Sequence, residues 1–296
     1  MRCHTLLLPL FLFIVCSHAL AKDVDTNRVL KSEGQFAWPD GALAAVCLTY
    51  DDGLDGHLDC AAPDLEAHGF RGTVYCPGYS RSLNKRMEEW RALAKRGHEL
   101  GNHSLFHPCK SIRSNGKERA WVVPEYALEN YTIRRMKDEL WVANSFLKAV
   151  DGKKDRTYGY TCSESDASGN SSIPEIRKFF TGARSNGPVP ITMTAFDRFH
   201  APSLVVNDHS STDLIAQTEE AAKNGTVAIF MLHSVGGGYL NVSSESHREF
   251  LDYLAKNKSR FYVAPFIEVI NWVHKKSLSR VSKKNSRYPL HKLEEV

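Results

Sequence analysis

Residues 44–53, Ala-Ala-Val-Cys-Leu-Thr-Tyr-Asp-Asp-Gly, contain both the first predicted strand and the first candidate site. The first seven form a largely apolar run with the length of a buried strand, which Asp51-Asp52-Gly53 ends with turn-forming residues. Adjacent carboxylates on a strand point to opposite faces, but at a turn opened by glycine both can face a common mouth. One aspartate could then bind a metal ion while the other acts as a base. A solvated Asp-Asp-Gly turn is the simpler alternative.

The chain after this run alternates between strand-like and helix-like segments. Apolar runs predict strands over 71–76, 98–101, 157–161, 179–183, 227–232 and 261–264. Helical apolar spacing predicts helices over 57–68, 87–95, 124–150, 173–179, 212–223, 244–255 and 266–273. This alternation, without an internal repeat, is typical of one α/β domain built on a parallel sheet or a barrel.

Both ends of the chain differ from this domain in composition. Residues 1–21 have a basic start, a short apolar core and a final Ala-Leu-Ala, which predict a signal peptide cleaved after Ala21 and a secreted or periplasmic protein. We assign 22–41 as a lead-in, 42–274 as the domain and 275–296 as a basic tail. The net charge of the whole chain is +4, and that of the tail alone is +5. The other 274 residues therefore have a net charge of −1. This balance argues against a basic body that binds nucleic acid.

Three histidines complete the set of candidate ligands and acids. His103 and His107 are four residues apart, so on a helix they would share one face and suit two ligands of a zinc-like ion. A pair of surface histidines is the alternative. His233 follows the apolar run 227–232, and the carboxyl end of a strand is where a barrel places catalytic groups. A lone histidine is more often structural, so none of these signals is specific by itself.

The combination of the three signals is much more specific. Tyr-Asp-Asp-Gly after a strand, then His-Ser-x-x-His, then a strand ending in Leu-His resembles the polysaccharide deacetylase family (the NodB homology domain, carbohydrate esterase family 4). Segments 72–75 and 97–103 also look like this family, and the resemblance extends over about 44–273. It implies an α/β fold, a distorted (β/α) barrel with fewer than eight regular units. It also implies a divalent metal, most simply Zn²⁺, with Asp52, His103 and His107 as ligands, Asp51 as general base and His233 as general acid.

The resemblance is weakest at the family's third motif, usually Arg-Pro-Pro-Tyr-Gly, whose arginine braces the base aspartate. The matching stretch 156–163, Arg-Thr-Tyr-Gly-Tyr-Thr-Cys-Ser, is more similar to a Tyr-Pro-Cys variant. Gly159 stands at the position of that arginine, so what tunes Asp51 is left open. Tyr160 and Cys162 remain candidates for substrate contact or oxyanion stabilisation.

Further side chains are expected around the barrel mouth. Cys109 lies two residues after His107 and Cys162 lies in the third-motif stretch, so we predict a disulfide that joins the two loops. The family's fourth motif, which supports the acid histidine, has no clear counterpart, and Asp197 and Asp208 are the only nearby acids. Two other histidines, His57 and His247, are expected on helix surfaces, with positions facing the cleft as the alternative.

The resemblance implies an exported, metal-dependent hydrolase that removes N-acetyl or O-acetyl groups from a polysaccharide or oligosaccharide. Its partner would be that acetylated glycan, with no nucleic acid, no transmembrane segment and no obligate protein partner. A non-catalytic carbohydrate-binding relative is the alternative. An iron(II) oxygenase also uses two histidines and one carboxylate, but its triad usually lies on an all-β scaffold with a close His-x-Asp pair. Here the aspartate precedes the histidines by about fifty residues in an α/β chain.

Overall fold

The computed structural model describes the backbone of residues 36–287 and the side chains of residues 36–278. The predicted signal peptide, most of the lead-in and the end of the basic tail lie outside the described residues. Within them, no helix has the length and apolar character needed to cross a membrane.

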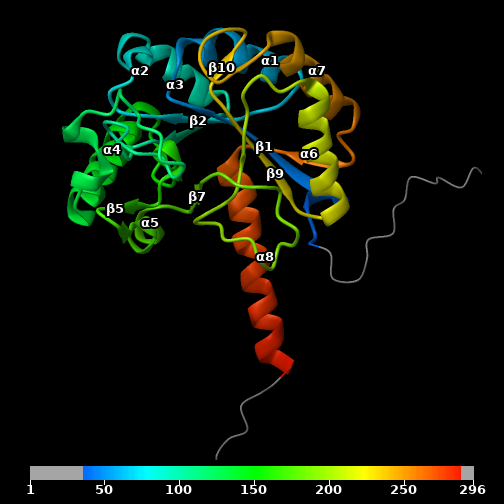
Figure 1. Ribbon diagram of the computed structural model, residues 1–296. Helices are drawn as coiled ribbons and strands as arrows, with labels where there is room; N and C mark the ends of the chain where they lie inside the picture. The colour runs from blue at the N-terminus through cyan, green and yellow to red at the C-terminus, as the bar shows by residue number, and fades with distance from the viewer. Residues whose placement is uncertain (1–35, 288–296) are drawn as a thin grey trace, which may run out of the picture. The chain divides into compact units, whose positions relative to one another are not determined.

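A curled parallel sheet of eight strands forms the centre of the domain (Figure 1). Its order is β7-β4-β3-β2-β1-β9-β8, and β12 pairs with the first half of β1. The strands are β1 (Ala44–Asp51), β2 (Thr73–Cys76), β3 (Glu99–Asn102), β4 (Thr157–Gly159), β7 (Gly182–Arg184), β8 (Leu204–Val205), β9 (Val227–Leu232) and β12 (Phe261–Val263). Strand β7 is followed by β8 without a helix between them, so there are fewer than eight regular strand–helix units. The curled sheet with its surrounding helices confirms the predicted distorted barrel.

Strand β1 is central because both of its faces are buried. Val46, Leu48 and Tyr50 join one apolar cluster, whereas Ala45 and Cys47 join a second cluster on the other face. This alternation follows from the two-residue period of a strand, and it explains why the sequence shows an unbroken apolar run. Full burial of a Val or Leu side chain contributes about 1.5–3 kcal/mol, so this strand anchors the domain.

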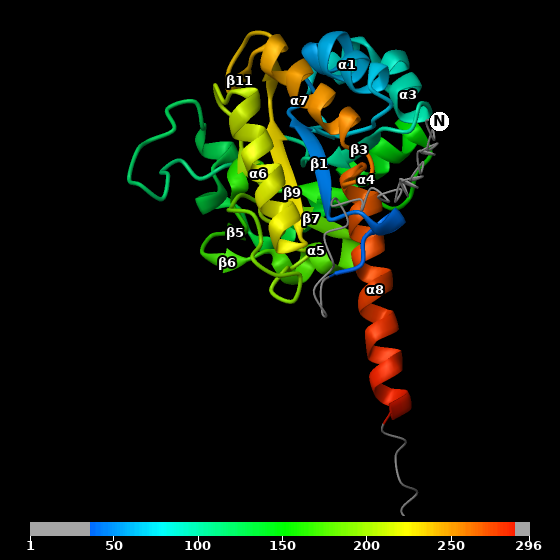
Figure 2. The same cartoon turned by 90° about the vertical axis from the view of Figure 1, so that its right-hand side faces the viewer.

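Helices cover both faces of the sheet (Figures 1 and 2). They are α1 (Ala62–Ala67), α2 (Arg81–Lys85), α3 (Met87–Lys95), α4 (Ile133–Asp151), α5 (Ile173–Phe179), α6 (Ser211–Asn224), α7 (Ser244–Lys256) and α8 (Phe266–Arg287). Two small sheets, β5 (Asp166–Ala167) with β6 (Asn170–Ser171) and β10 (Ser234–Val235) with β11 (Asn241–Val242), lie in loops. Local signals set several ends: a Ser210–Asp213 capping box starts α6, and left-handed Gly225 ends it.

Most predicted elements are confirmed, but several differ in extent. The helix predicted over 124–150 begins only at Ile133, after two short 3₁₀ turns at Pro124–Tyr126 and Leu128–Asn130. The last helix does not end at Val273 but continues to Arg287, because neither Gly nor Pro occurs between these two residues. Strand β8 and the two small sheets were not predicted, since two-residue strands carry no periodic signal.

Candidate metal centre and active site

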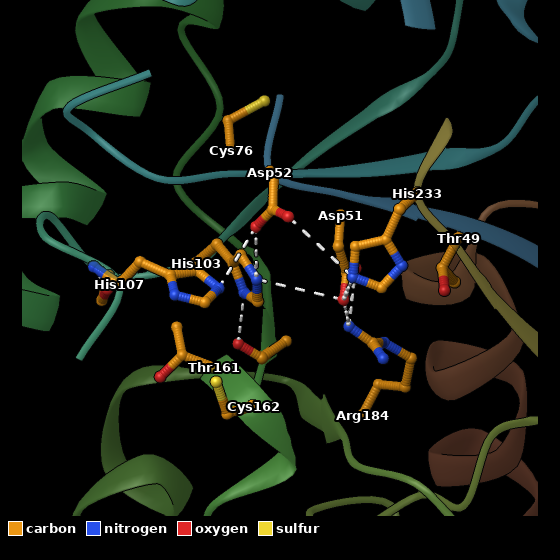
Figure 3. Close-up of polar contacts among 12 residues, drawn as sticks. Thr49, Asp51, Asp52, Cys76, His103, His107, Thr161, Cys162, Arg184 and His233 are labelled. Atoms are coloured by element: carbon orange, nitrogen blue, oxygen red, sulfur yellow. Dashed lines mark hydrogen bonds and ion pairs between the residues drawn. The ribbon is translucent and has the colours of Figure 1, made fainter. Parts of the chain in front are cut away.

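The candidate residues meet at the carboxyl edge of the parallel sheet (Figure 3). Asp51 is the last residue of β1, and Arg184 is the last residue of β7. His103 and His233 directly follow β3 and β9. Parallel strands bring their carboxyl ends to one edge, which is where α/β folds bind ligands. The topology therefore gathers residues that are up to about 180 positions apart in the sequence.

Asp52, His103 and His107 form a compact set of three possible metal ligands. Asp52 Oδ1 lies 3.5 Å from His103 Nε2 and 3.2 Å from His107 Nε2, and the three ligand atoms lie within 4.8 Å of one another. This Oδ1 atom is buried and accepts no hydrogen bond of good geometry from the described residues. Burial opposes the charged form of Asp52, but its contacts with His103 and His107 outweigh it and hold the pKa of this carboxyl well below its ordinary value.

Both imidazoles are oriented by contacts on their far side. His103 Nδ1 donates to the carbonyl oxygen of Gly159 at 2.7 Å, so its Nε2 carries the free lone pair that faces Asp52. His107 Nδ1 contacts Cys109 Sγ at 3.5 Å, which leaves its Nε2 toward the same carboxylate. Such contacts fix the tautomer and the direction of ligand histidines.

The expected helix between the two histidines is wrong. The segment after β3 is irregular, and both Ser104 (φ 65°) and His107 (φ 52°) adopt the left-handed region. Ser104 Oγ accepts the backbone N–H of His107 at 2.9 Å and closes a tight turn. The turn brings the imidazole centroids to 4.9 Å, so the pair converges by a different local structure.

Asp51 is held by an arginine that the sequence analysis missed. Arg184 is fully buried, and its Nη2 donates to both carboxylate oxygens of Asp51, at 2.7 and 2.6 Å. Gly159 lies opposite Arg184 in the β4–β7 ladder, and a Cβ atom there would lie only 2.9 Å from Arg184 Nη2. Gly159 aligns with the arginine of the family's third motif. Because glycine has no side chain, it leaves space that Arg184 of the neighbouring strand fills. The available signal was a basic residue directly after the run 179–183.

His233 lies on the opposite side of Asp52 from His107 (Figure 3). Its Nε2 is 3.9 Å from the nearest oxygens of both Asp51 and Asp52, and its buried Nδ1 has no hydrogen-bond partner among the described residues. Burial lowers the pKa of His233, although the two carboxylates oppose this. Neither Asp197, which pairs with Arg177 at 2.7 Å, nor Asp208 contacts His233.

Two histidines expected on helix surfaces are buried. His57 Nδ1 accepts the backbone N–H of Leu54 at 3.1 Å, so its Nε2 donates to the carbonyl oxygen of His233 at 2.8 Å. His247 is held between the Tyr50 hydroxyl at 2.8 Å and Asp64 at 3.1 Å. These polar partners explain how a histidine can occupy an otherwise apolar interior. His57 thereby joins the turn after β1 to the backbone of His233.

His57 predicts a loss of stability in acid. Burial lowers its pKa from 6.5 to about 4, so the unfolded chain binds a proton that the folded protein excludes. Its stabilising effect is complete above pH 6.5 and is lost as the pH falls toward 4, by roughly 3 kcal/mol. Urea unfolding at several pH values should show this slope weakened in His57→Gln and retained in His274→Gln, whose side chain is exposed on α8. Equal slopes in both variants would contradict it.

The two candidates from the third motif, Tyr160 and Cys162, differ in where their side chains point. Tyr160 is buried, and its hydroxyl donates to the carbonyl oxygen of Phe199 at 2.9 Å, away from the histidines. Cys162 occupies a left-handed turn (φ 51°) and forms a disulfide with Cys109, the pairing named from the sequence. Thr161 Oγ1 also donates to the carbonyl oxygen of Pro108, at 2.5 Å. Two loops 53 residues apart are thus joined next to His107.

The disulfide is expected to support the metal centre. Replacing both Cys109 and Cys162 with serine removes the covalent link of this loop, and we expect a loss of about 2–4 kcal/mol in the free energy of unfolding. Zinc affinity should also fall, because the Cys109 sulfur that contacts His107 is replaced. Cys60→Ser, which changes a half-buried free cysteine, is the control. A thiol assay that finds both cysteines free in the exported protein would rule out this role.

A cavity of about 1050 Å³ opens above the site. Asp51, Asp52 and the three site histidines line it together with the exposed aromatic rings of Tyr79, Trp121 and Tyr239. The Tyr239 hydroxyl donates to Asp52 Oδ2, and its ring centroid lies 5.6 Å from that of His233. The ring centroid of Trp121 lies 6.1 Å from that of His107. These rings could not be predicted from the sequence, because they lie on irregular loops without a periodic pattern.

The chain is similar to known proteins in sequence and in fold. A sequence model described as polysaccharide deacetylase matches residues 41–172. A gellan lyase from a Bacillus species is 24% identical over 190 residues, which cover 64% of this chain but only 6% of that protein. The chain thus spans a small part of this curated relative.

Two solved structures share the fold. A Mycobacterium smegmatis protein assigned to the polysaccharide deacetylases superposes with a TM-score of 0.58 at 16% identity, over 82% of this chain and 94% of that one. The Xyl-CE4 domain of a multidomain xylanase from the hindgut metagenome of Trinervitermes trinervoides gives 0.50 at 17% identity, over 79% and 91%. At these identities the likeness concerns the fold. The match over residues 41–172 is a similarity in sequence to the polysaccharide deacetylase family, the NodB homology or carbohydrate esterase 4 group, and the solved structures agree with it in fold.

Proposed function

We propose that this protein is an exported, metal-dependent hydrolase that removes N-acetyl or O-acetyl groups from a glycan. The observation that carries the proposal is the placement of two units in one cavity. One is the ligand triangle of Asp52, His103 and His107, and the other is the Arg184-held carboxylate of Asp51. Export rests on the predicted signal peptide alone.

The donor set fits a divalent metal ion. Two neutral imidazole nitrogens and one carboxylate oxygen are the donors that zinc accepts in catalytic sites with open positions. The buried Asp52 Oδ1 has no hydrogen-bond partner among the described residues, so it is available as the carboxylate ligand. A bound ion would polarise the acetyl carbonyl and lower the pKa of a water molecule.

The remaining side chains supply proton transfer. Arg184 is the hydrogen-bond donor to Asp51, and its guanidinium keeps the carboxylate in place. The carboxylate can accept the proton of the attacking water. His233 reaches the same space from the other side of Asp52 and can protonate the departing sugar nitrogen or oxygen. The backbone N–H of Cys162, which has no partner among the described groups, is the candidate donor to the developing oxyanion.

The walls of the cavity suit a sugar chain. Tyr79, Trp121 and Tyr239 are between 51% and 59% exposed, so their rings offer flat apolar faces next to the polar centre. Specific pockets combine such apolar surface with a few oriented polar groups.

The alternative of a non-catalytic carbohydrate-binding relative is favoured by one observation. The buried Nδ1 of His233 lacks the acidic partner that would orient an acid histidine. The five site residues and the ionic contact between Arg184 and Asp51 favour catalysis instead.

Acetate release decides between the two functions. The zinc-loaded protein is incubated with N-acetylated and O-acetylated glycans, and acetate is measured before and after treatment with a chelator. We expect release from at least one glycan, lost with chelator and restored by zinc. Binding of glycans without release from any of them would establish the alternative.

A further inference from the structure

The ionisable groups that line the cavity are almost all paired within the protein. Asp51 pairs with Arg184, Asp52 contacts the two ligand histidines, Asp55 pairs with Arg86 at 3.3 Å, and Arg119 pairs with Glu164 at 3.2 Å. In these contacts opposite charges largely cancel, so the paired groups give the cavity little net charge. Any charge available to a substrate must therefore come from side chains outside this set.

Two arginines of the cavity wall differ from the rest. Arg81 and Arg113 are exposed, and neither forms an ion pair or a side-chain hydrogen bond with the described residues. Arg81 begins α2, and Arg113 lies in a turn of the long connection between β3 and α4, where its backbone N–H donates to Lys117 at 2.8 Å. The two cations therefore face the cavity without a partner.

Both arginines line this one cavity, and the loops that carry them start from neighbouring strands, β2 and β3. The loop before α2 is bonded to the segment after β3, since Gly78 and Tyr79 donate to the carbonyl oxygens of Ser104 and Leu105 at 3.0 Å. The side toward β8 and β9 carries no charged side chain besides the active-site groups. It is lined by Asn186, Val205, Met231, Tyr239 and Leu240. Outside the active-site groups, Arg81 and Arg113 are thus the charged side chains of the described lining that form no ion pair.

We propose that the substrate is an anionic glycan, with a carboxylate-bearing sugar bound by Arg81 and Arg113 next to the acetylated sugar. This inference rests on the proposed function. With a divalent ion on Asp52, the centre keeps one positive charge because Arg184 already neutralises Asp51, and the two free arginines add to it. Such a field attracts an anionic chain, and the planar guanidinium fits a carboxylate in a bidentate manner.

Kinetics on a matched pair of polymers tests the proposal. One is acetylated polygalacturonate, and the other is the same polymer after its carboxyl groups have been reduced to alcohols, at equal acetyl content. We expect kcat/KM to favour the anionic polymer. Exchange of both arginines in Arg81→Gln/Arg113→Gln should lower this preference about 10-fold, about 3-fold for each residue, and 0.5 M salt should largely abolish it. Arg248→Gln, an exposed arginine of α7 outside the cavity, should keep the preference.

A binding measurement separates this proposal from the proposed function. Calorimetry of zinc-loaded Asp51→Asn protein with unacetylated trigalacturonate requires no turnover. An affinity that falls about 10-fold in the double arginine variant supports the proposal even if no glycan releases acetate. Direct binding of the carboxylate to zinc would be unaffected by the arginines. Equal affinity with and without the two arginines, or equal kcat/KM for the two polymers, would overturn the proposal while leaving the deacetylase function intact.

Discussion

Asp51→Asn should lower kcat for acetate release by about 10²–10⁴-fold, because the amide cannot accept the proton of the attacking water. Some stability is lost because the buried Arg184 guanidinium loses its counterion, but Asn has nearly the same shape and keeps one side-chain oxygen for Arg184, so the metal ligands next to it should keep their positions. The protein should therefore still bind zinc with one-to-one stoichiometry. Measured together, release and zinc content separate a missing base from a missing metal site.

Asp55→Asn is the matched control for this experiment. Asp55 lines the same cavity, but it is largely exposed and pairs with Arg86 rather than with the active-site groups. Its exchange should change kcat by less than about 3-fold, in line with the small worth of exposed ion pairs. A wild-type kcat in Asp51→Asn would remove this aspartate from the mechanism.

Arg184→Ala should have the largest effect on stability. It leaves the carboxylate of Asp51 buried without its counterion, and breaking a buried ion pair from one side costs about 3–5 kcal/mol. Acetate release should fall as well, because Asp51 is no longer held in place. The free energy of unfolding from urea titration, together with kcat of the folded fraction, measures both effects.

Two variants make the Arg184 result specific. Arg184→Lys keeps the charge and should recover part of the stability, but not the contact of one nitrogen with both oxygens. Arg177→Ala breaks an ion pair with Asp197 in which both partners are nearly half exposed, and it should cost less than about 1 kcal/mol. Equal losses in Arg177→Ala and Arg184→Ala would mean that the buried pair has no special role.

The strand β1 and the residues at the sheet edge could be predicted because their signals are local. An unbroken apolar run, two aspartates and a glycine lie within ten residues, and each strand end is marked by a polar residue. From the spacing of His103 and His107 it was correct to predict that their side chains lie close together, but incorrect to assume a helix between them. A turn with two left-handed residues, not a helix, brings their rings together.

The partners of these residues could not be predicted because they depend on strand pairing. Arg184 reaches Asp51 only because β7 lies beside β4 and Gly159 leaves space between them. The burial of His57 likewise depends on the backbone of His233, 176 residues later. Apolar periodicity contains no information about contacts of this kind.

The metal requirement of the proposed hydrolase can be tested by titrating the metal-free protein with zinc and measuring acetate release after each addition. We expect release from an acetylated glycan to rise linearly with zinc up to one equivalent and then to stay constant. His107→Ala should show little release at one equivalent, because one of the three ligands is missing. Release by the metal-free protein at the full rate, or a His107→Ala titration that matches the wild type, would contradict a metal centre at these residues.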